Sequence, residues 1–163
     1  MFPEIQTIHK PFDDLMGFIE ENLEGNMDEP TITHIKAIIA SLQDKSKWGI
    51  IMMGNVGAGK TTLMRLLNEY FFQRVYHNNK AYPVIYHTAK EIAKRAINGN
   101  EYNEYCYVLA IDDLGEEAKE VMSYGNVITP ITDIIESRYD SRKMRFFTTN
   151  LDVNGIKEKH GAR

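Results

Sequence analysis

Residues 48–61 read WGIIMMGNVGAGKT, a short apolar run followed by a glycine-rich turn that ends in a lysine and a threonine. Residues 54–61 fit the pattern G-x-x-x-x-G-K-[ST], in which a strand leads into a phosphate-binding loop and the loop leads into a helix. The three glycines let the backbone bend so that successive N–H groups point at an anion. The stretch therefore predicts a P-loop within an α/β fold.

The side chains around this loop have distinct expected roles. Lys60 can reach the β- and γ-phosphates, and the Thr61 hydroxyl can ligate Mg²⁺. The helix that begins near Lys60 adds the positive end of its dipole, and Thr62 is placed to touch the α-phosphate. A glycine turn with an accidental GKT is the alternative, which the flanking elements and a second motif disfavour. We expect ATP or ADP and Mg²⁺ as cofactors, with the nucleotide held by Gly54, Asn55, Val56, Gly57, Ala58, Gly59, Lys60, Thr61 and Thr62.

The second motif is an apolar strand that ends in two carboxylates, Asp112 and Asp113. A carboxylate at the C-terminal end of such a strand is the Walker B arrangement, in which the first acid holds Mg²⁺. We assign Asp112 to the metal and Asp113 to polarising the attacking water. Asp113 can instead simply cap a loop, and Glu116 and Glu117 are then the other candidates.

Strands and helices alternate along the chain. Short apolar runs predict strands at residues 48–53, 82–87, 105–111 and 144–149, and helical periodicity predicts helices at 11–24, 31–43, 60–74, 88–98 and 127–142. Thr31 is the expected cap of the second helix, and Thr88 with Glu91 forms a capping box. The alternation predicts a doubly wound, mostly parallel sheet flanked by helices. We divide the chain into a helical segment, 1–47, that packs on the core, and a nucleotide-binding α/β core, 48–163.

Asn150 follows the fourth predicted strand in the sequence Thr148-Thr149-Asn150. An asparagine after a strand is often only a turn residue. Here it comes after both nucleotide-binding motifs, at a strand tip expected beside Asp112. We therefore expect Asn150 to orient the water against the γ-phosphate, and we group it with Lys60 and Asp113 as catalytic.

Several segments make the sequence resemble the DnaC-type helicase loaders and the IstB-type transposition helpers, which are AAA+ ATPases. They are the IDDLG run, the glutamate after it, Arg138-Tyr139, TTNL at the sensor 1 position, and KHGAR, which is similar to a Y-G-x-R segment. The resemblance covers residues 48–163. It implies an AAA+ core with sheet order 5-1-4-3-2, bound ATP and Mg²⁺, and assembly around single-stranded DNA or a helicase ring.

The sequence departs from these families in two places. Residues 1–47 carry no recognisable helicase-binding module. The resemblance also places an arginine finger, a fifth strand and a helical lid with sensor 2 beyond the KHGAR segment, so we expect a fragment of a longer protein. Arg163 is then the helix-end arginine that precedes the finger. Without a fifth strand, residues 48–53 form an unpaired apolar edge, for which we predict self-association.

Composition sets limits on the class of protein. The chain has 163 residues, 43% hydrophobic and 26% charged, as expected for one soluble domain. A formal net charge of -4 argues against binding nucleic acid by bulk electrostatics. The single Cys106 excludes an internal disulfide and is expected as an inert core thiol, and the five histidines show no zinc-ligand spacing. No apolar run predicts a membrane span or signal peptide, so we expect a cytoplasmic protein.

Our first hypothesis is the ATPase core of a replicative helicase loader. Its expected partners are a replicative helicase, single-stranded DNA bound through the oligomer, and a second copy across the ATP site. The alternatives are a DNA-binding transposition helper, a nucleotide-gated scaffold with little hydrolysis, and a small-molecule P-loop kinase. The kinase is disfavoured because no acceptor pocket or arginine-bearing lid is apparent. A trans-acting arginine contributes about 10³–10⁵ in rate, so we expect very weak hydrolysis from this chain alone.

Overall fold

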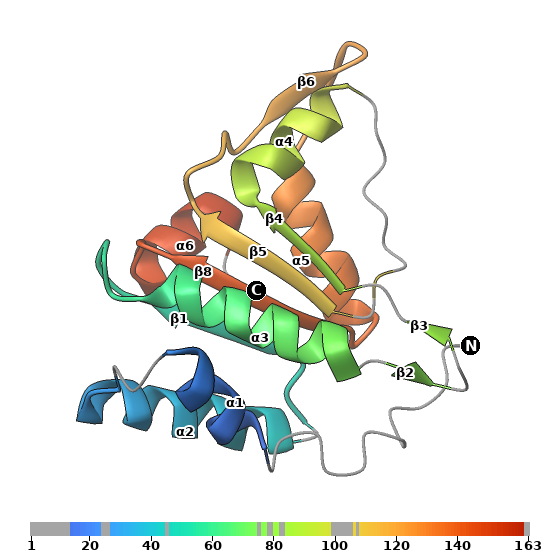
Figure 1. Cartoon of the computed structure of the whole chain (residues 1–163). Helices are drawn as coiled ribbons and strands as arrows, with labels where there is room; N and C mark the ends of the chain where they lie inside the picture. The colour runs from blue at the N-terminus through green and yellow to red at the C-terminus, as the bar shows by residue number, and fades with distance from the viewer. Residues whose placement is uncertain are drawn as a thin grey trace.

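The computed structural model describes residues 14–23, 27–44, 46–74, 76–77, 80–81, 84–98, 106 and 108–161. This part of the chain forms six helices and eight strands (Figure 1). In order they are α1 (Leu15–Asn22), α2 (Glu29–Gln43), β1 (Gly49–Met53), α3 (Lys60–Arg74), β2 (Tyr76–His77), β3 (Lys80–Ala81), β4 (Val84–Thr88), α4 (Ala89–Ile97), β5 (Val108–Leu114), β6 (Val121–Ser123), β7 (Asn126–Ile128), α5 (Pro130–Asp140), β8 (Met144–Thr149) and α6 (Val153–His160).

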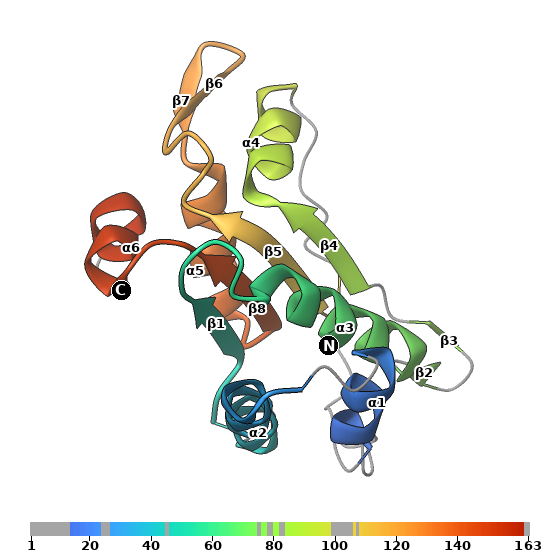
Figure 2. The ribbon, with the colours of Figure 1, turned by 60° about the vertical axis from the view of Figure 1, so that its left-hand side comes forward.

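The central sheet has four strands in the order β1-β8-β5-β4, and all three neighbouring pairs are parallel (Figure 2). In terms of the strands expected from the sequence, this order is 1-4-3-2, which confirms the four-strand part of the predicted arrangement. Parallel strands need long crossover connections, which helices usually supply. Here α3 lies between β1 and β4 in the chain, α4 between β4 and β5, and α5 between β5 and β8.

Helices cover both faces of this sheet. One core cluster joins α1, α2 and α3 to the side chains of Val108, Ala110 and Phe146. The other joins α4 and α5 to Leu109, Ile111 and Phe147, which alternate with the first set along β5 and β8. A strand buried on both faces reads as a continuous apolar run, as β5 does over Val108–Ile111.

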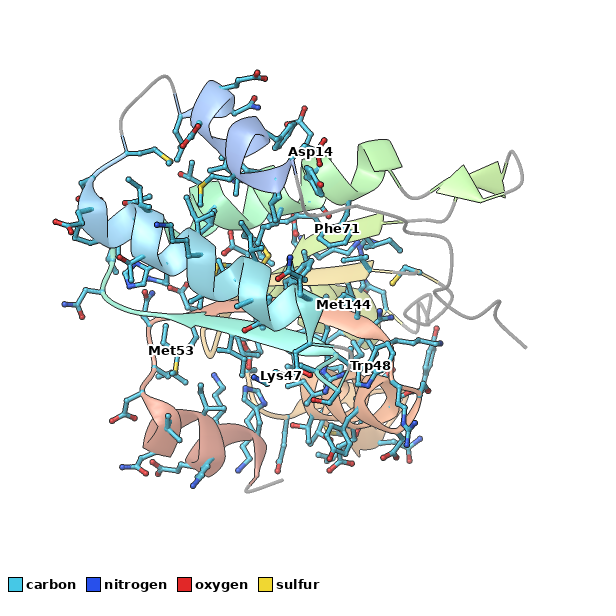
Figure 3. All side chains as sticks on the ribbon, turned by 90° about the horizontal axis from the view of Figure 1, so that it is seen from below. Asp14, Lys47, Trp48, Met53, Phe71 and Met144 are labelled. Atoms are coloured by element: carbon cyan, nitrogen blue, oxygen red, sulfur yellow. The ribbon has the colours of Figure 1, made fainter. Side chains whose placement is uncertain are left out.

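Strand β1 differs from the expectation of burial on both faces. Ile50 and Met52 pack against the α2–α3 cluster, but Ile51 and Met53 are 46% and 49% exposed. The second core cluster contacts β5 and β8 but contains no residue of β1, so this face of β1 is left uncovered. In the described part of the chain β1 pairs with β8 alone, so β1 is an edge strand whose end, at Met53, is visible in Figure 3.

The N-terminal helices begin differently from the prediction. The cap of α2 is Asp28, whose side chain accepts a hydrogen bond of 2.9 Å from the Thr31 backbone N–H, and not Thr31 itself. Pro30 then lies in the first turn, where its missing N–H costs nothing. Helix α1 covers only part of the predicted 11–24, and Phe12 and Gly25 fall outside the described residues. The Thr88–Glu91 capping box of α4 is confirmed.

Two later boundaries also move. Strand β5 continues to Leu114, so both aspartates lie within the strand and not after it. The helix expected from residue 127 begins at Pro130, because residues 126–128 pair with β6 in an antiparallel hairpin. Tyr124 and Gly125 turn this hairpin with φ of 48° and 83°, the left-handed pair that a two-residue hairpin favours. This hairpin, the short β2–β3 pair and α6 were not predicted from the sequence.

Candidate nucleotide-binding site

The predicted phosphate loop connects β1 to α3. Its three glycines have positive φ values of 153°, 86° and 76° at Gly54, Gly57 and Gly59. An added Cβ at Gly57 or Gly59 would meet nothing within 4 Å, so the constraint there is the backbone conformation and not crowding. Val56 at the crest is 85% exposed, and Thr62 is exposed on the first turn of α3. The loop presents open backbone in front of a helix N-terminus, which suits an anionic group.

Lys60 lies across the mouth of this loop. Its ammonium donates to the carbonyl oxygens of Gly54 at 2.7 Å and Asn55 at 2.8 Å, and to Oδ1 of Asn150 at 2.9 Å. Asn150 comes from the tip of β8, 90 residues further along the chain. The structure therefore brings together two of the three residues that were predicted to be catalytic.

Asp112 contacts Thr61, the residue after this lysine, and is only 2% exposed. Oδ1 accepts from the Thr61 hydroxyl at 3.1 Å and from the Thr148 hydroxyl, and Oδ2 accepts from the Tyr86 hydroxyl at 2.5 Å. The Thr61–Asp112 contact joins the two residues that were predicted to hold the metal.

The chemistry of this pair fits Mg²⁺. The cation prefers oxygen ligands and keeps several waters, so it is held by one or two protein groups and by substrate phosphates. Thr61 and Asp112 supply a hydroxyl and a carboxylate at the loop. Among the described residues there is no group of three or more His, Cys, Asp or Glu side chains able to hold a metal ion.

Asp113 has an unusual backbone. Its φ is +55°, and the register between β5 and β8 shifts between Ile111 and Leu114, so the strand bulges at the two aspartates. The bulge is fixed from β8, since the Asp113 N–H donates to the Thr148 hydroxyl at 2.9 Å. A bulge re-aims a side chain next to many active sites, and here it turns Asp113 out of the regular alternation of β5.

The charge on Asp113 is unfavourable in this position. Burial raises the pKa of its carboxyl above 3.8, and the neighbouring charges of Asp112 and Glu116 raise it further, while Lys60 and Lys90 oppose the shift. A raised pKa in a carboxylate beside a phosphate loop is what a proton acceptor would need. Its role as water-polarising residue stays a prediction.

The two glutamates named as fallback candidates have other partners. Glu116 is exposed and forms an ion pair of 2.6 Å with Lys90 of α4. The side chain of Glu117 is fully buried and pairs with Lys159 at 3.6 Å and His160 at 3.2 Å. Burial raises the pKa of Glu117, but hydrogen bonds from His160 and the local backbone and the charge of Lys159 outweigh it, so the net pKa is below 4.5.

These contacts connect α6 to the end of β5. Besides its ion pair, the Lys159 ammonium donates to the carbonyls of Gly115 and Glu117, both at 2.5 Å. The Gly115 N–H donates to Glu117 at 2.8 Å, and a Cβ on Gly115 would lie 2.9 Å from Cγ of Leu151. The first two residues of the KHGAR segment therefore anchor the loop that follows Asp113.

A cavity of 370 Å³ opens beside the phosphate loop, between α2 and the edge strand β1. Its lining combines apolar side chains with a few polar groups: His34, Ala37, Ile38, Ser41, Ile50, Ile51, Met52, Met53, Ala58, Gly59, Lys60 and Leu63. From the sequence alone we expect the adenine contact loosely around Phe12, a residue that lies outside the described part of the chain. The cavity was not predicted, since it depends on how α2 sits against β1.

Other residues singled out in the sequence are structural. Arg138 is 2% exposed and donates to the Cys106 carbonyl at 3.2 Å and the Met144 carbonyl at 2.6 Å, so it closes the start of the sheet. Cys106 is buried, and burial raises its thiol pKa despite the nearby Arg138. No helix of the described chain is long and apolar enough to span a bilayer.

Sequence reasoning missed three residues of the site, namely Tyr86, Arg65 and Thr148. Tyr86 joins Asp112 to Arg65, whose Nε donates to the Tyr86 hydroxyl at 3.4 Å. The alternation of side chains along a strand could have indicated two of them. Once the strand order and register are known, Tyr86 and Thr148 lie on the same face of the sheet as Asp112.

No protein-family model matches this chain, and the search of curated proteins found no match. Solved structures do match. DnaI is 22% identical with a TM-score of 0.59, over 82% of this chain and 73% of DnaI. AMPPCP-bound DnaA from Aquifex aeolicus is 18% identical with a TM-score of 0.60, over 84% of this chain and 43% of that one. Domain III of the Thermotoga maritima replication initiation protein DnaA is 18% identical with a TM-score of 0.54, over 74% of this chain and 51% of that one.

These likenesses establish the fold. The chain shares with these structures an α/β fold with a mostly parallel sheet flanked by helices. It spans about half or less of the two DnaA chains.

Proposed function

We propose that this chain is the ATP-binding, Mg²⁺-dependent ATPase core of a DNA-replication protein. One observation carries the proposal: residues from three separate segments converge at the carboxyl edge of the sheet. Lys60 reaches Asn150 at 2.9 Å, and Thr61 reaches Asp112 at 3.1 Å. Convergence of this kind at the ends of parallel strands marks the nucleotide site of open α/β sheets.

The chain's own groups divide the work of hydrolysis. The loop N–H groups and Lys60 bind the β- and γ-phosphates, and Thr61 and Asp112 hold the metal side of the site. Asp113 polarises the attacking water, and Asn150, fixed by Lys60, orients it. Bound Mg²⁺ supplies neutralisation of the charge that develops on the transferred phosphate.

The cavity between α2 and β1 is the proposed place for the nucleoside. It is continuous with the loop, since Ala58, Gly59 and Lys60 line both. Its size falls within the range of small-molecule sites, and its mixed lining suits a flat base with polar edges. His34 and Ser41 are the lining side chains able to hydrogen-bond a base.

A replicative helicase loader is our first choice of biological role. The support is the IDDLG and TTNL resemblance together with the fold likeness to DnaI and DnaA. The proposed partners are a replicative helicase, single-stranded DNA bound through an oligomer, and a second copy across the ATP site, in the cytoplasm. A transposition helper shares the same site and differs in its partner. A nucleotide-gated scaffold would bind ATP with little hydrolysis.

The direct test of the proposal is Lys60→Ala. Loss of a charged hydrogen-bond donor to phosphate removes roughly 1.5–3 kcal/mol, so ATP binding should weaken by about 10- to 100-fold or more. Lys36→Ala is the matched control, because Lys36 is exposed on α2 and does not line the loop. Titration calorimetry or a fluorescent ATP analogue gives both affinities. Equal affinity in the wild type and the Lys60 variant would refute the assignment.

The partner requires a separate experiment. The purified chain, immobilised with ATP and Mg²⁺, is offered a hexameric replicative helicase in one arm and a transposase in the other. Retention of the helicase supports the loader, and retention of the transposase alone supports the transposition helper. Lys60→Ala should lose either interaction if nucleotide binding controls it.

A further inference from the structure

Tyr86 makes a contact with the metal-site carboxylate that no motif assigns. It lies on β4, the strand next to β5, and its hydroxyl donates to Oδ2 of Asp112 at 2.5 Å. The other oxygen, Oδ1, accepts from Thr61 and Thr148. The two oxygens of Asp112 are thus held by different elements, Oδ1 by α3 and β8, and Oδ2 by β4.

Tyr86 is itself held in place by α3. The Arg65 guanidinium donates to the Tyr86 hydroxyl at 3.4 Å and lies over its ring with 5.7 Å from Cζ to the ring centroid. Arg65 is exposed on α3, five residues after Lys60, and α3 packs against β4 and β5. The contacts Arg65–Tyr86–Asp112 therefore connect α3, the helix that follows the loop, to the carboxylate on β5. Figure 1 shows α3 beside β4 and β5.

Alignment of Asp112 depends on all these donors. The buried carboxylate can rotate about its side-chain torsions, and a rotation that satisfied Oδ2 elsewhere would draw Oδ1 away from Thr61. Groups that hydrogen-bond a metal-site carboxylate orient it, and their loss typically lowers metal affinity 10- to 100-fold. The Tyr86 hydroxyl is the only donor to Oδ2 that the described residues show.

We propose that Tyr86 is a positioning residue that orients Asp112 for Mg²⁺, and that Arg65 supports it from α3. This inference rests on the proposed nucleotide site and adds a residue to it. The effect should concern the metal and not the phosphates, because neither side chain lines the loop or touches Lys60. This role predicts a specific effect: loss of the Tyr86 hydroxyl should change how nucleotide binding depends on the Mg²⁺ concentration.

The test is Tyr86→Phe, which removes one hydroxyl and keeps the ring. The affinity for a fluorescent ATP analogue is measured in EDTA and over a series of free Mg²⁺ concentrations. Affinity in EDTA should match the wild type, and the Mg²⁺ concentration at half-effect should rise by about 10-fold. Tyr124→Phe is the matched control, since Tyr124 is 86% exposed at the tip of the β6–β7 hairpin, and it should leave both values unchanged.

Arg65→Gln provides a second variant that leaves the core intact, because Arg65 is exposed. It should shift the Mg²⁺ dependence in the same direction by a smaller factor. A wild-type Mg²⁺ dependence in folded Tyr86→Phe would overturn the role of Tyr86, and the nucleotide site would stand if Lys60→Ala still loses binding. A fall in EDTA affinity equal to the fall in Mg²⁺ would mean general damage to the site and would also overturn it. Failure of the wild type to bind the analogue would overturn the proposed function.

Discussion

At the scale of single residues, Asp113 combines a strained backbone with an unfavourable charge. Its φ of +55° is one that non-glycine residues adopt at a cost, although aspartate tolerates it better than most. Its carboxyl pKa is raised by burial and by two neighbouring acids. Residues with such features cluster at functional sites, where surrounding contacts hold them in place. The bond from its N–H to Thr148 is that contact here.

Replacing Asp113 with asparagine should separate function from stability. Asparagine keeps the shape and tolerates the left-handed backbone, so ATP binding should persist while hydrolysis falls by about 10²–10⁴-fold. The variant should also melt about 1–3 °C higher at pH 7, because it removes a disfavoured charge. Steady-state phosphate release and thermal unfolding measure the two effects.

The pH dependence of this difference has a definite sign. The folded pKa of Asp113 lies above its unfolded value, so its protonation stabilises the fold below about pH 3.8 and that contribution is lost as pH rises through the folded pKa. The gap in melting temperature between the asparagine variant and the wild type should therefore shrink as the pH falls from 7 toward 4. A gap that widened on acidification would contradict the assignment.

At the scale of elements, helix α6 is attached to the end of β5 through one buried carboxylate, Glu117. Glu117 holds Lys159 and His160, and Thr132 of α5 lies 3.3 Å from Nδ1 of His160. Helix α6 begins just after Asn150, and the loop it contacts begins just after Asp113. The attachment therefore holds together the segments that carry two of the three predicted catalytic side chains, Asp113 and Asn150.

Glu117→Gln should loosen this attachment. Removing one partner of a buried ion pair typically costs 3–5 kcal/mol, so the free energy of unfolding in urea at pH 7 should fall by about 3 kcal/mol. The folded pKa of Glu117 lies below 4.5, so its contribution is present above about pH 4.5 and is lost as pH falls through the folded value. The free energies of unfolding of the wild type and the Glu117→Gln variant should thus become similar only at acid pH. Glu158→Gln makes the same change on the exposed side of α6 and should have little effect.

At the scale of the whole molecule, the sheet has one open edge and one half-covered face, both at β1. Ile51 and Met53 are exposed there, and within the described chain only β8 pairs with β1. An unpaired apolar strand edge is a template for association with another strand. The same strand lines the cavity beside the phosphate loop.

We expect self-association of this chain through β1. The sedimentation coefficient should rise with protein concentration, and Ile51→Lys should suppress the rise, because a charge on an edge strand opposes pairing. Val153→Lys is the control, since Val153 on α6 is similarly exposed, at 51%. A monomeric profile of the wild type across a wide range of concentration would argue against this interface.

How far the sequence could predict this molecule depends on whether each feature is local. The phosphate loop and the strand that carries Asp112 were predictable, because each is a contiguous stretch whose residue types match the binding of phosphate or of a metal ion. The Tyr86–Asp112 contact joins different strands and needs the strand order and side-chain rotamers. The β6–β7 hairpin was missed because Val127 and Ile128 continue the apolar spacing of the helix that follows them. The exposed face of β1 was missed because an apolar run does not reveal what covers it.

The hairpin divides the chain into two interleaved parts. Strand β8 lies between β1 and β5 in the sheet but comes from the C-terminal side of the hairpin, whereas both neighbours come from the N-terminal side. A chain severed at the exposed Tyr124–Gly125 turn would give two pieces, and neither could complete the sheet alone. Lys60 would be on one piece and Asn150 on the other. The molecule could therefore serve as a split reporter, in which nucleotide binding is restored only when the two pieces associate.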